Sequence, residues 1–114
     1  MLVAAARMTL HVDPADTRSR DFVMFMKSPT AIPLPTVDLG RLVVRKAYRG
    51  RGYASALNEV RIQEARRLGA KSIIVTASLS NAKLLEKLGF TYTGETVYFS
   101  DRPRVQFHAM LLKL

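Results

Sequence analysis

The chain has 114 residues, the length of a single domain over 1–114, and it is long enough to bury roughly 65% of its unfolded surface. It contains no cysteine, which excludes disulfide bonds, thiolate metal sites and a cysteine nucleophile. Lysine and arginine number 18 against nine aspartate and glutamate residues, a net charge of +9, so we expect either a generally basic surface or a polyanionic partner.

The chain begins with an apolar stretch, residues 2–12, that we interpret as a strand. It is a poor signal peptide because Arg7 interrupts it and no basic region precedes it. No stretch of the sequence approaches the length of a membrane-spanning helix. We therefore expect a cytoplasmic protein with no membrane partner.

The next part of the chain is rich in turn signals. After a turn at 13–16, the pattern predicts a second short strand over 22–26 and then a loop over 27–36, where three prolines exclude a helix or a central strand. Residues 38–45 are nearly continuous in leucine and valine, which is typical of a strand buried on both faces. The segment 13–36 as a whole suggests no function.

The longest periodic segment predicts a helix over 52–68 that ends at Gly69. At 100° per residue its apolar residues share one side, which we expect to be buried. These residues are Tyr53, Ala54, Leu57, Val60, Ala65 and Leu68.

The last part of the chain predicts a β-branched strand at 72–77, a short helix at 81–88 capped by Ser80, and strands at 96–100 and 105–114. Strand, helix and strand across 38–77 form a βαβ unit, so its two strands should be parallel. The closing hairpin is antiparallel. The sequence therefore predicts an α/β fold with a mixed sheet, a central βαβ unit and a C-terminal antiparallel hairpin.

A basic, glycine-rich turn lies between the third strand and the long helix. Five of the 18 cationic residues lie in the eleven-residue segment 41–51 around it: Arg41, Arg45, Lys46, Arg49 and Arg51. A Walker loop is absent, and a dinucleotide fingerprint would need a third glycine that is missing here. The segment 49–54, Arg-Gly-Arg-Gly-Tyr-Ala, satisfies the pattern [QR]-x-x-G-x-[GA]. Such a turn directs backbone N–H groups and the positive end of a helix dipole at one point, which favours a phosphate ligand.

These motifs together resemble the GNAT superfamily of acetyl-CoA-dependent N-acetyltransferases over roughly residues 38–114. The apolar strand, the turn at 49–54 and the following helix occur in the family's order. Asn81 then precedes Leu84-Leu-Glu-Lys-Leu-Gly-Phe90, which looks like the family's "N…YEKLGF" segment. The turn at 49–54 or the segment 84–90 alone would be only a weak indication of the family. Both motifs together, at the number of residues that separates them in the family, are a specific indication.

The resemblance implies a cofactor site for acetyl-CoA, which serves as co-substrate, and it implies no metal. The third strand and the strand at 72–77 would separate, and the pantetheine arm would enter between them. Backbone groups of Leu42 and Val44 would pair with that arm, and an N–H near Val43 would stabilise the oxyanion. The pyrophosphate would bind the amides of Arg49, Gly50, Arg51, Gly52, Tyr53 and Ala54. Asn81 would reach the pantetheine or the backbone near it.

The same resemblance suggests catalytic candidates. Asp38 falls where some protein-lysine acetyltransferases of the family carry a catalytic glutamate, and the alternative is a structural residue at a strand end. Leu85 occupies the position where the family often carries a thiolate-protonating tyrosine, so that acid is missing and Leu85 is expected in the core. Substitutes for the acid are Tyr92, Tyr98, His108 and Ser78, each with a structural alternative.

The resemblance also implies a short N-terminus, because residues 2–7 look like the family's second strand. The first strand and both early helices would then be absent, through a misassigned start, a fragment or a true short form. An exposed sheet edge and an open apolar face would favour a homodimer.

We therefore expect an N-acetyltransferase that moves an acetyl group from acetyl-CoA to an amine by direct attack in a ternary complex. The acceptor is a small-molecule or peptide amine that the sequence does not name. The alternative is a non-catalytic acyl-CoA-binding module or partner subunit, which the missing tyrosine favours. A weaker alternative is a small basic RNA-associated protein, although no basic helix interleaved with aromatic residues supports nucleic-acid binding.

Overall fold

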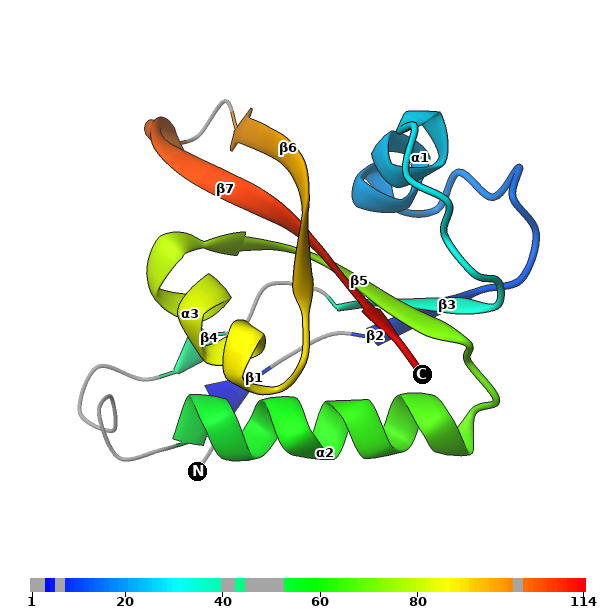
Figure 1. Ribbon diagram of the computed structural model, residues 1–114, viewed down its shortest axis with the longest axis horizontal. Helices are drawn as coiled ribbons and strands as arrows, with labels where there is room; N and C mark the ends of the chain where they lie inside the picture. Colours follow the sequence, from blue (N-terminus) through cyan, green and yellow to red (C-terminus); the bar gives the residue numbers. More distant parts are fainter. Residues whose placement is uncertain (1–3, 6–7, 40–42, 45–52, 100–101) are drawn as a thin grey trace.

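The computed structural model describes residues 4–5, 8–39, 43–44, 53–99 and 102–114 (Figure 1). Its elements in chain order are β1 (Ala4–Ala5), β2 (Met8–His11), α1 (Arg20–Lys27), β3 (Thr36–Leu39), β4 (Val43–Val44), α2 (Tyr53–Arg67), β5 (Ser72–Ser78), α3 (Leu79–Lys87), β6 (Thr91–Phe99) and β7 (Arg102–Lys113). None of the helices in these ranges is long and apolar enough to cross a membrane.

Five strands form a mixed sheet in the order β2-β3-β5-β7-β6. The βαβ unit of β3, α2 and β5 joins parallel strands, because a helical crossover returns the chain in the same direction. The pairs β2–β3, β5–β7 and β6–β7 are antiparallel. The predicted α/β class, the central βαβ unit and the closing antiparallel hairpin are all confirmed.

The sheet divides at the end of β3. The register pairs Asp38 with Ile74, the last pair between β3 and β5 in the described residues. Farther along the chain, β4 pairs with β1 in a separate two-stranded sheet, while β5 continues beside β7 as far as Ser78 (Figure 1). The expected separation of these two strands is therefore present, with Asp38 at the point where they part.

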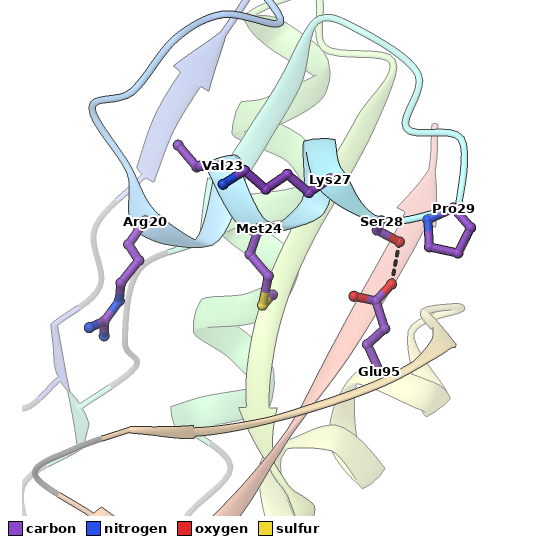
Figure 2. Close-up of a pocket in the computed structure, with 7 residues that line it drawn as sticks. All are labelled: Arg20, Val23, Met24, Lys27, Ser28, Pro29 and Glu95. Carbon is purple, nitrogen blue, oxygen red and sulfur yellow. Dashed lines mark hydrogen bonds between the residues drawn. The ribbon is translucent and has the colours of Figure 1, made fainter.

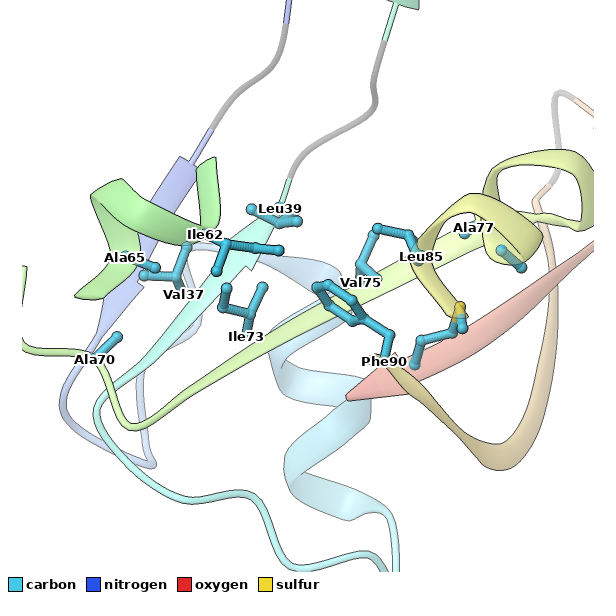
Figure 3. Packing of buried hydrophobic residues seen from close by; sticks show 12 residues of the cluster. Val37, Leu39, Ile62, Ala65, Ala70, Ile73, Val75, Ala77, Leu85 and Phe90 are labelled. Atoms are coloured by element: carbon cyan, nitrogen blue, oxygen red, sulfur yellow. The ribbon is translucent and has the colours of Figure 1, made fainter. Parts of the chain in front are cut away.

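Helices cover the sheet on both faces. In β5 the residues alternate between the faces, so that Ile73, Val75 and Ala77 belong to one apolar core and Ile74 to the other. The larger core packs Ile62 and Ala65 of α2 and residues of α3 against the first face (Figure 3). The smaller core packs α1 against the second face, and its buried members are Phe22, Phe25, Ile74, Ala109 and Leu111.

The expected strand over 22–26 is wrong, because these residues form helix α1. Ser19 caps the helix by accepting a hydrogen bond from the Phe22 N–H at 3.3 Å. Phe22 and Phe25 are three residues apart and are both buried, which is the spacing of a helix face. A run of five apolar residues does not distinguish a short strand from a buried helix turn, and here packing against the sheet decides.

The other element boundaries differ from expectation in smaller ways. The short helix begins earlier, at Leu79, and its N-cap is Ser78 rather than Ser80. The hairpin strand β6 is longer than the expected 96–100. Gly69 and Gly89 end α2 and α3 as predicted, with φ angles of +80° and +100° that favour glycine.

Candidate functional site

Asp38, the expected catalytic base, is buried where the sheet divides, with 6% of its surface exposed. Its Oδ2 accepts a short hydrogen bond from the hydroxyl of Ser19, the residue that caps α1. The same hydroxyl oxygen accepts the N–H of Phe22. Asp38 therefore holds the beginning of α1 against the sheet. If Asp38 is also the catalytic base, the same carboxylate has both a structural and a catalytic role.

A fully buried histidine lies beside Asp38. The His11 Nε2 is 4.0 Å from Asp38 Oδ2, and His11 Nδ1 is 2.7 Å from Asp16 Oδ2. The ring stacks on Phe22, with centroids 4.0 Å apart and planes 6° from parallel. Because an ionised carboxylate only accepts hydrogen bonds, the proton of this short contact belongs to Nδ1. The sequence pattern did not mark His11, since a lone histidine in a strand carries no spacing signal.

Asp16 is fixed as a carboxylate by Arg18. The guanidinium donates to Asp16 Oδ2 from Nε at 2.9 Å and from Nη2 at 2.6 Å. The Arg18 backbone N–H adds a bond to Oδ1 at 2.9 Å. These side-chain and backbone hydrogen bonds hold the pKa of Asp16 well below its usual range.

A buried arginine adds positive charge from the other side of the sheet. Arg61 of α2 is only 4% exposed, and burial lowers the pKa of its guanidinium to about 10, while the negative charge of Asp38 acts in the opposite direction. Arg61 therefore stays charged at neutral pH, and its field favours the ionised form of Asp38.

The buried side of α2 is only partly the one expected. Ala65 is fully buried as predicted, but Val60 and Leu68 are 60% and 41% exposed, and Asn58 and Arg61 are almost fully buried beside Ile62. The helix is rotated so that polar groups face inward, and apolar periodicity does not detect that. Such buried polar groups are costly unless they are hydrogen-bonded or serve a ligand.

Asn81, an expected cofactor contact, lies in the first turn of α3 beside α2. Its Oδ1 accepts a hydrogen bond at 3.4 Å from the Nδ2 of Asn58. The Asn58 side chain is therefore a neighbour of the expected cofactor site that sequence reasoning missed. Its spacing of three and four residues from Arg61 and Ile62 would have placed it on the same helix face.

The expected acid candidates are not brought together with Asp38. Asp38 pairs with Ile74 across β3 and β5, and both side chains lie on the face of the sheet that α1 covers. His108 pairs with Ala77, whose side chain lies on the other face, so His108 lies there too. His108 meets the ring of Tyr92 edge to face at 5.7 Å. Tyr98 on β6 is 58% exposed.

Two further acid candidates have other contacts. The Tyr92 hydroxyl donates to Glu86, and this hydrogen bond raises the pKa of Tyr92. Ser78 caps α3. Leu85 is fully buried in the larger core, which confirms its expected core position.

The turn that is expected to bind phosphate lies mostly outside the described residues. Leu42, Arg49, Gly50, Arg51 and Gly52 belong to the undescribed ranges, so their predicted contacts stay predictions. The flanking elements are described: Val43 and Val44 form β4, and Tyr53 and Ala54 begin α2. The strand predicted before the turn and the helix predicted after it are therefore both present.

A pocket of about 430 Å³ lies between α1 and β6 (Figure 2). One stripe of α1 forms its wall, and Glu95 of β6 faces that wall, where its carboxylate accepts a short hydrogen bond from the Ser28 hydroxyl. The lining residues are Arg20, Val23, Met24, Lys27, Ser28, Pro29 and Glu95. The sequence pattern did not indicate this pocket, because the strand predicted over 22–26 would not form the helical wall that lines it.

The chain belongs to the acetyltransferase (GNAT) family, whose model matches residues 22–90. No curated protein matches the chain. Solved structures do match it: the NatC complex bound to Gag peptide and CoA is similar at a TM-score of 0.68 and 19% identity, over 98% of this chain and 61% of that one.

Two further structures extend the likeness. A GCN5-related N-acetyltransferase from Kribbella flavida has a TM-score of 0.64 and 24% identity, over 98% of this chain and 60% of that one. The protein yncA from Salmonella typhimurium, solved with its cofactor acetyl-CoA, has a TM-score of 0.56 and 30% identity, over 69% of this chain and 48% of that one. The chain spans about 60% or less of the length of these structures.

Proposed function

We propose that this protein transfers an acetyl group from acetyl-CoA to an amine by direct attack in a ternary complex. The observation that carries the proposal is the division of the sheet after Asp38 and Ile74. Beyond that point the described part of β5 pairs only with β7, so Val75 to Ser78 offer backbone groups on the side where β3 has ended. An extended pantetheine arm needs such backbone partners.

Asn81 fits the same cofactor. Because Asn58 Nδ2 donates to its Oδ1, the side-chain amide of Asn81 is oriented with its own N–H groups left to donate. A pantetheine carbonyl is an acceptor for such a group. The amides and arginines of 49–54 would hold the pyrophosphate at the beginning of α2, where the helix dipole is positive.

Asp38 supplies the proton acceptor in this proposal. An alkyl ammonium with a pKa near ~10.4 must lose its proton before it attacks a thioester. Asp38 takes that proton, directly or through a water, and the amine nitrogen then bonds to the acetyl carbon. A backbone N–H near Val43 stabilises the oxyanion of the tetrahedral adduct. The adduct then expels the CoA thiolate, which takes up the second proton that the amine nitrogen loses as the amide forms.

The acceptor amine is proposed to bind in the pocket between α1 and β6. The pocket is on the same face of the sheet as Asp38, and Ser19, which bonds Asp38, is adjacent in the chain to the lining residue Arg20. Its wall of Val23 and Met24 suits the carbon chain of an acceptor, while Glu95 suits a cationic group.

The proposal is tested by calorimetric titration with acetyl-CoA, followed by a thiol assay for CoA release over a panel of amines and peptides. Wild-type protein is expected to bind acetyl-CoA at micromolar concentration, and Gly52→Val is expected to lose at least tenfold in affinity because a side chain blocks the approach of phosphate. Ala56→Val is the control, since it places the same side chain at an exposed position of α2. Unchanged affinity for acetyl-CoA in Gly52→Val would refute the proposal that the turn at 49–54 binds the pyrophosphate.

A second candidate is a non-catalytic acyl-CoA-binding module. The burial of Leu85 favours it, because the position offers no hydroxyl to protonate the thiolate, and His108 lies on the face opposite Asp38. Binding without CoA release over the whole panel would establish this candidate instead.

Homodimer formation is proposed through β2, which is an edge strand of the described sheet. Unpaired edge groups of this kind pair readily with a second copy. Sedimentation velocity over a concentration series tests it, and a mass of 12.8 kDa at every concentration would refute it.

A further inference from the structure

The buried contacts around Asp38 include a histidine that the proposed reaction does not yet use. His11 is fully buried between two carboxylates, at 2.7 Å from Asp16 and 4.0 Å from Asp38. We infer that Asp16, His11 and Asp38 form one coupled proton-binding unit in which His11 is a positioning residue that keeps Asp38 ionised. This inference rests on the proposed role of Asp38 as the base.

The ring of His11 has little freedom to move away from Asp38. One face stacks on Phe22, and Nδ1 is held by Asp16, which is itself clamped by Arg18. The Nε2 atom therefore keeps its position beside Asp38. Nε2 has no hydrogen-bond partner among the described residues, which is uncommon for a buried ring nitrogen.

The charges that face His11 favour a proton on this nitrogen when Asp38 is ionised. Asp16 lies on the Nδ1 side and remains a carboxylate because Arg18 binds it. Asp38 lies on the Nε2 side, with the Ser19 hydroxyl on its Oδ2 and the charge of Arg61 acting on it from α2. The Phe22 ring is apolar and contributes no charge.

The consequence is an electrostatic coupling within the unit. A proton on His11 Nε2 would lie between the carboxylates of Asp16 and Asp38, and the positive ring would in turn stabilise the ionised form of Asp38. An opposite charge within about 4–6 Å shifts a carboxyl by roughly 1–3 pKa units toward the ionised form. The protons are shared, so the midpoints belong to the unit rather than to single residues.

Nuclear magnetic resonance tests this coupling without any substrate. The chain has two histidines, so the ¹⁵N signals of His11 are assigned by comparison with His108→Gln. In Asp38→Asn, whose amide oxygen can still accept from Ser19, the titration midpoint of His11 is expected to fall by about one pH unit or more. An unchanged midpoint would overturn the inference.

A second measurement uses the unmutated chain and so does not depend on the folding of a variant. The ¹³C carboxyl signal of Asp38 should show an inflection at the titration midpoint of His11, because the two groups share protons. An Asp38 signal that is flat through that pH would also overturn the inference.

The pH dependence of kcat/KM connects the unit to catalysis. In His11→Gln and in His11→Phe, which retains an aromatic ring against Phe22, the acid limb is expected to move up by about one pH unit, while the plateau at high pH remains. If His11 had only a structural role, the two substitutions would lower the free energy of unfolding and leave the acid limb of kcat/KM at its wild-type pH. That result would count against the inference.

The outcomes separate this inference from the proposed function. If no amine is acetylated but the magnetic resonance coupling is present, the proposed function fails and the coupled unit stands. If acetylation occurs and His11 titrates independently of Asp38, the proposed function stands and the inference fails.

Discussion

The Thr76 hydroxyl donates a hydrogen bond to Asp21 Oδ2 at 3.0 Å and so ties helix α1 to strand β5. Thr76 is two residues beyond Ile74, the partner of Asp38 at the point where the sheet divides. The helix is therefore fixed beside the stretch of β5 that borders the proposed cofactor gap. The segment 13–36, which had no functional interpretation in the sequence, thus forms a wall on the face where Asp38 lies.

Replacing Thr76 by valine should loosen this wall at nearly constant side-chain volume. We expect the free energy of unfolding to fall by about 1–3 kcal/mol, because Asp21 loses a donor, and the acceptor KM to rise while the affinity for acetyl-CoA is unchanged. Urea unfolding, acetylation kinetics and calorimetry measure the three quantities. Thr96→Val, at an exposed position of β6, is the control and should leave all three unchanged.

Asp38→Asn should reduce kcat by about 10²–10⁴-fold, because the carboxamide cannot accept a proton from the acceptor amine. The bond from Ser19 can persist, so α1 should remain in place. The rate of CoA release is measured alongside circular dichroism. Glu59→Gln removes one negative charge from an exposed position of α2 and is the matched control. Equal rates for Asp38→Asn and wild type would remove Asp38 from the mechanism.

Asp16 should make folding stability depend on pH in the acid range. Its pKa is lower in the folded protein than the ordinary value of about 3.9, so it stabilises the fold above that pH. This contribution is lost as the pH falls through and below about 4, toward the pKa of the folded state.

The variant Asp16→Asn should accordingly be less stable than wild type at pH 7, and the difference should shrink by pH 3. Urea midpoints at both pH values measure it, with Asp13→Asn as a control for the loss of one exposed charge in the same turn. A difference that does not vary with pH would show that the lost packing, and not the charge, accounts for the effect.

Leu85→Tyr introduces the tyrosine that the family resemblance led us to expect at this position, and it should not supply an acid. Leu85 is fully buried in the larger core, so the added ring atoms should destabilise the fold by about 1–3 kcal/mol. We expect kcat to stay level or fall. A clear rise in kcat would mean that the tyrosine hydroxyl reaches the thiolate. Leu85→Met, which nearly conserves volume, should cost less than about 1.5 kcal/mol and serves as the control.

Local signals predicted much of the fold correctly. Gly69 and Gly89 mark the helix ends because each takes a positive φ that other residues avoid. The βαβ unit follows from the order of a buried strand, a helix and a β-branched strand, and connection rules then fix its parallel direction. The glycine turn and the Lys-Leu-Gly-Phe segment led to the family that the comparisons confirm.

Other features depended on contacts between distant segments. Whether 22–26 formed a strand or a helix was decided by the packing of Phe22 and Phe25 on the sheet. Polar residues contribute to the buried side of α2. Asn58 donates a hydrogen bond to Asn81, and the positive charge of Arg61 is attracted by the negative charge of Asp38. Hydrophobic periodicity counts only apolar residues and cannot anticipate such partners.

The sequence by itself determined the α/β class and the family, because these follow from local propensity, motif spacing and chain order. It predicted Asp38 as the first residue of a strand over 38–45, whereas strand β3 is Thr36–Leu39 and Asp38 lies near its end. Only the tertiary structure decided what surrounds Asp38. It placed His11 and Ser19 beside the carboxylate, and it left His108 on the opposite face. The physical reason is that strand pairing fixes the face on which each side chain lies, and a one-residue change of register would exchange the two faces.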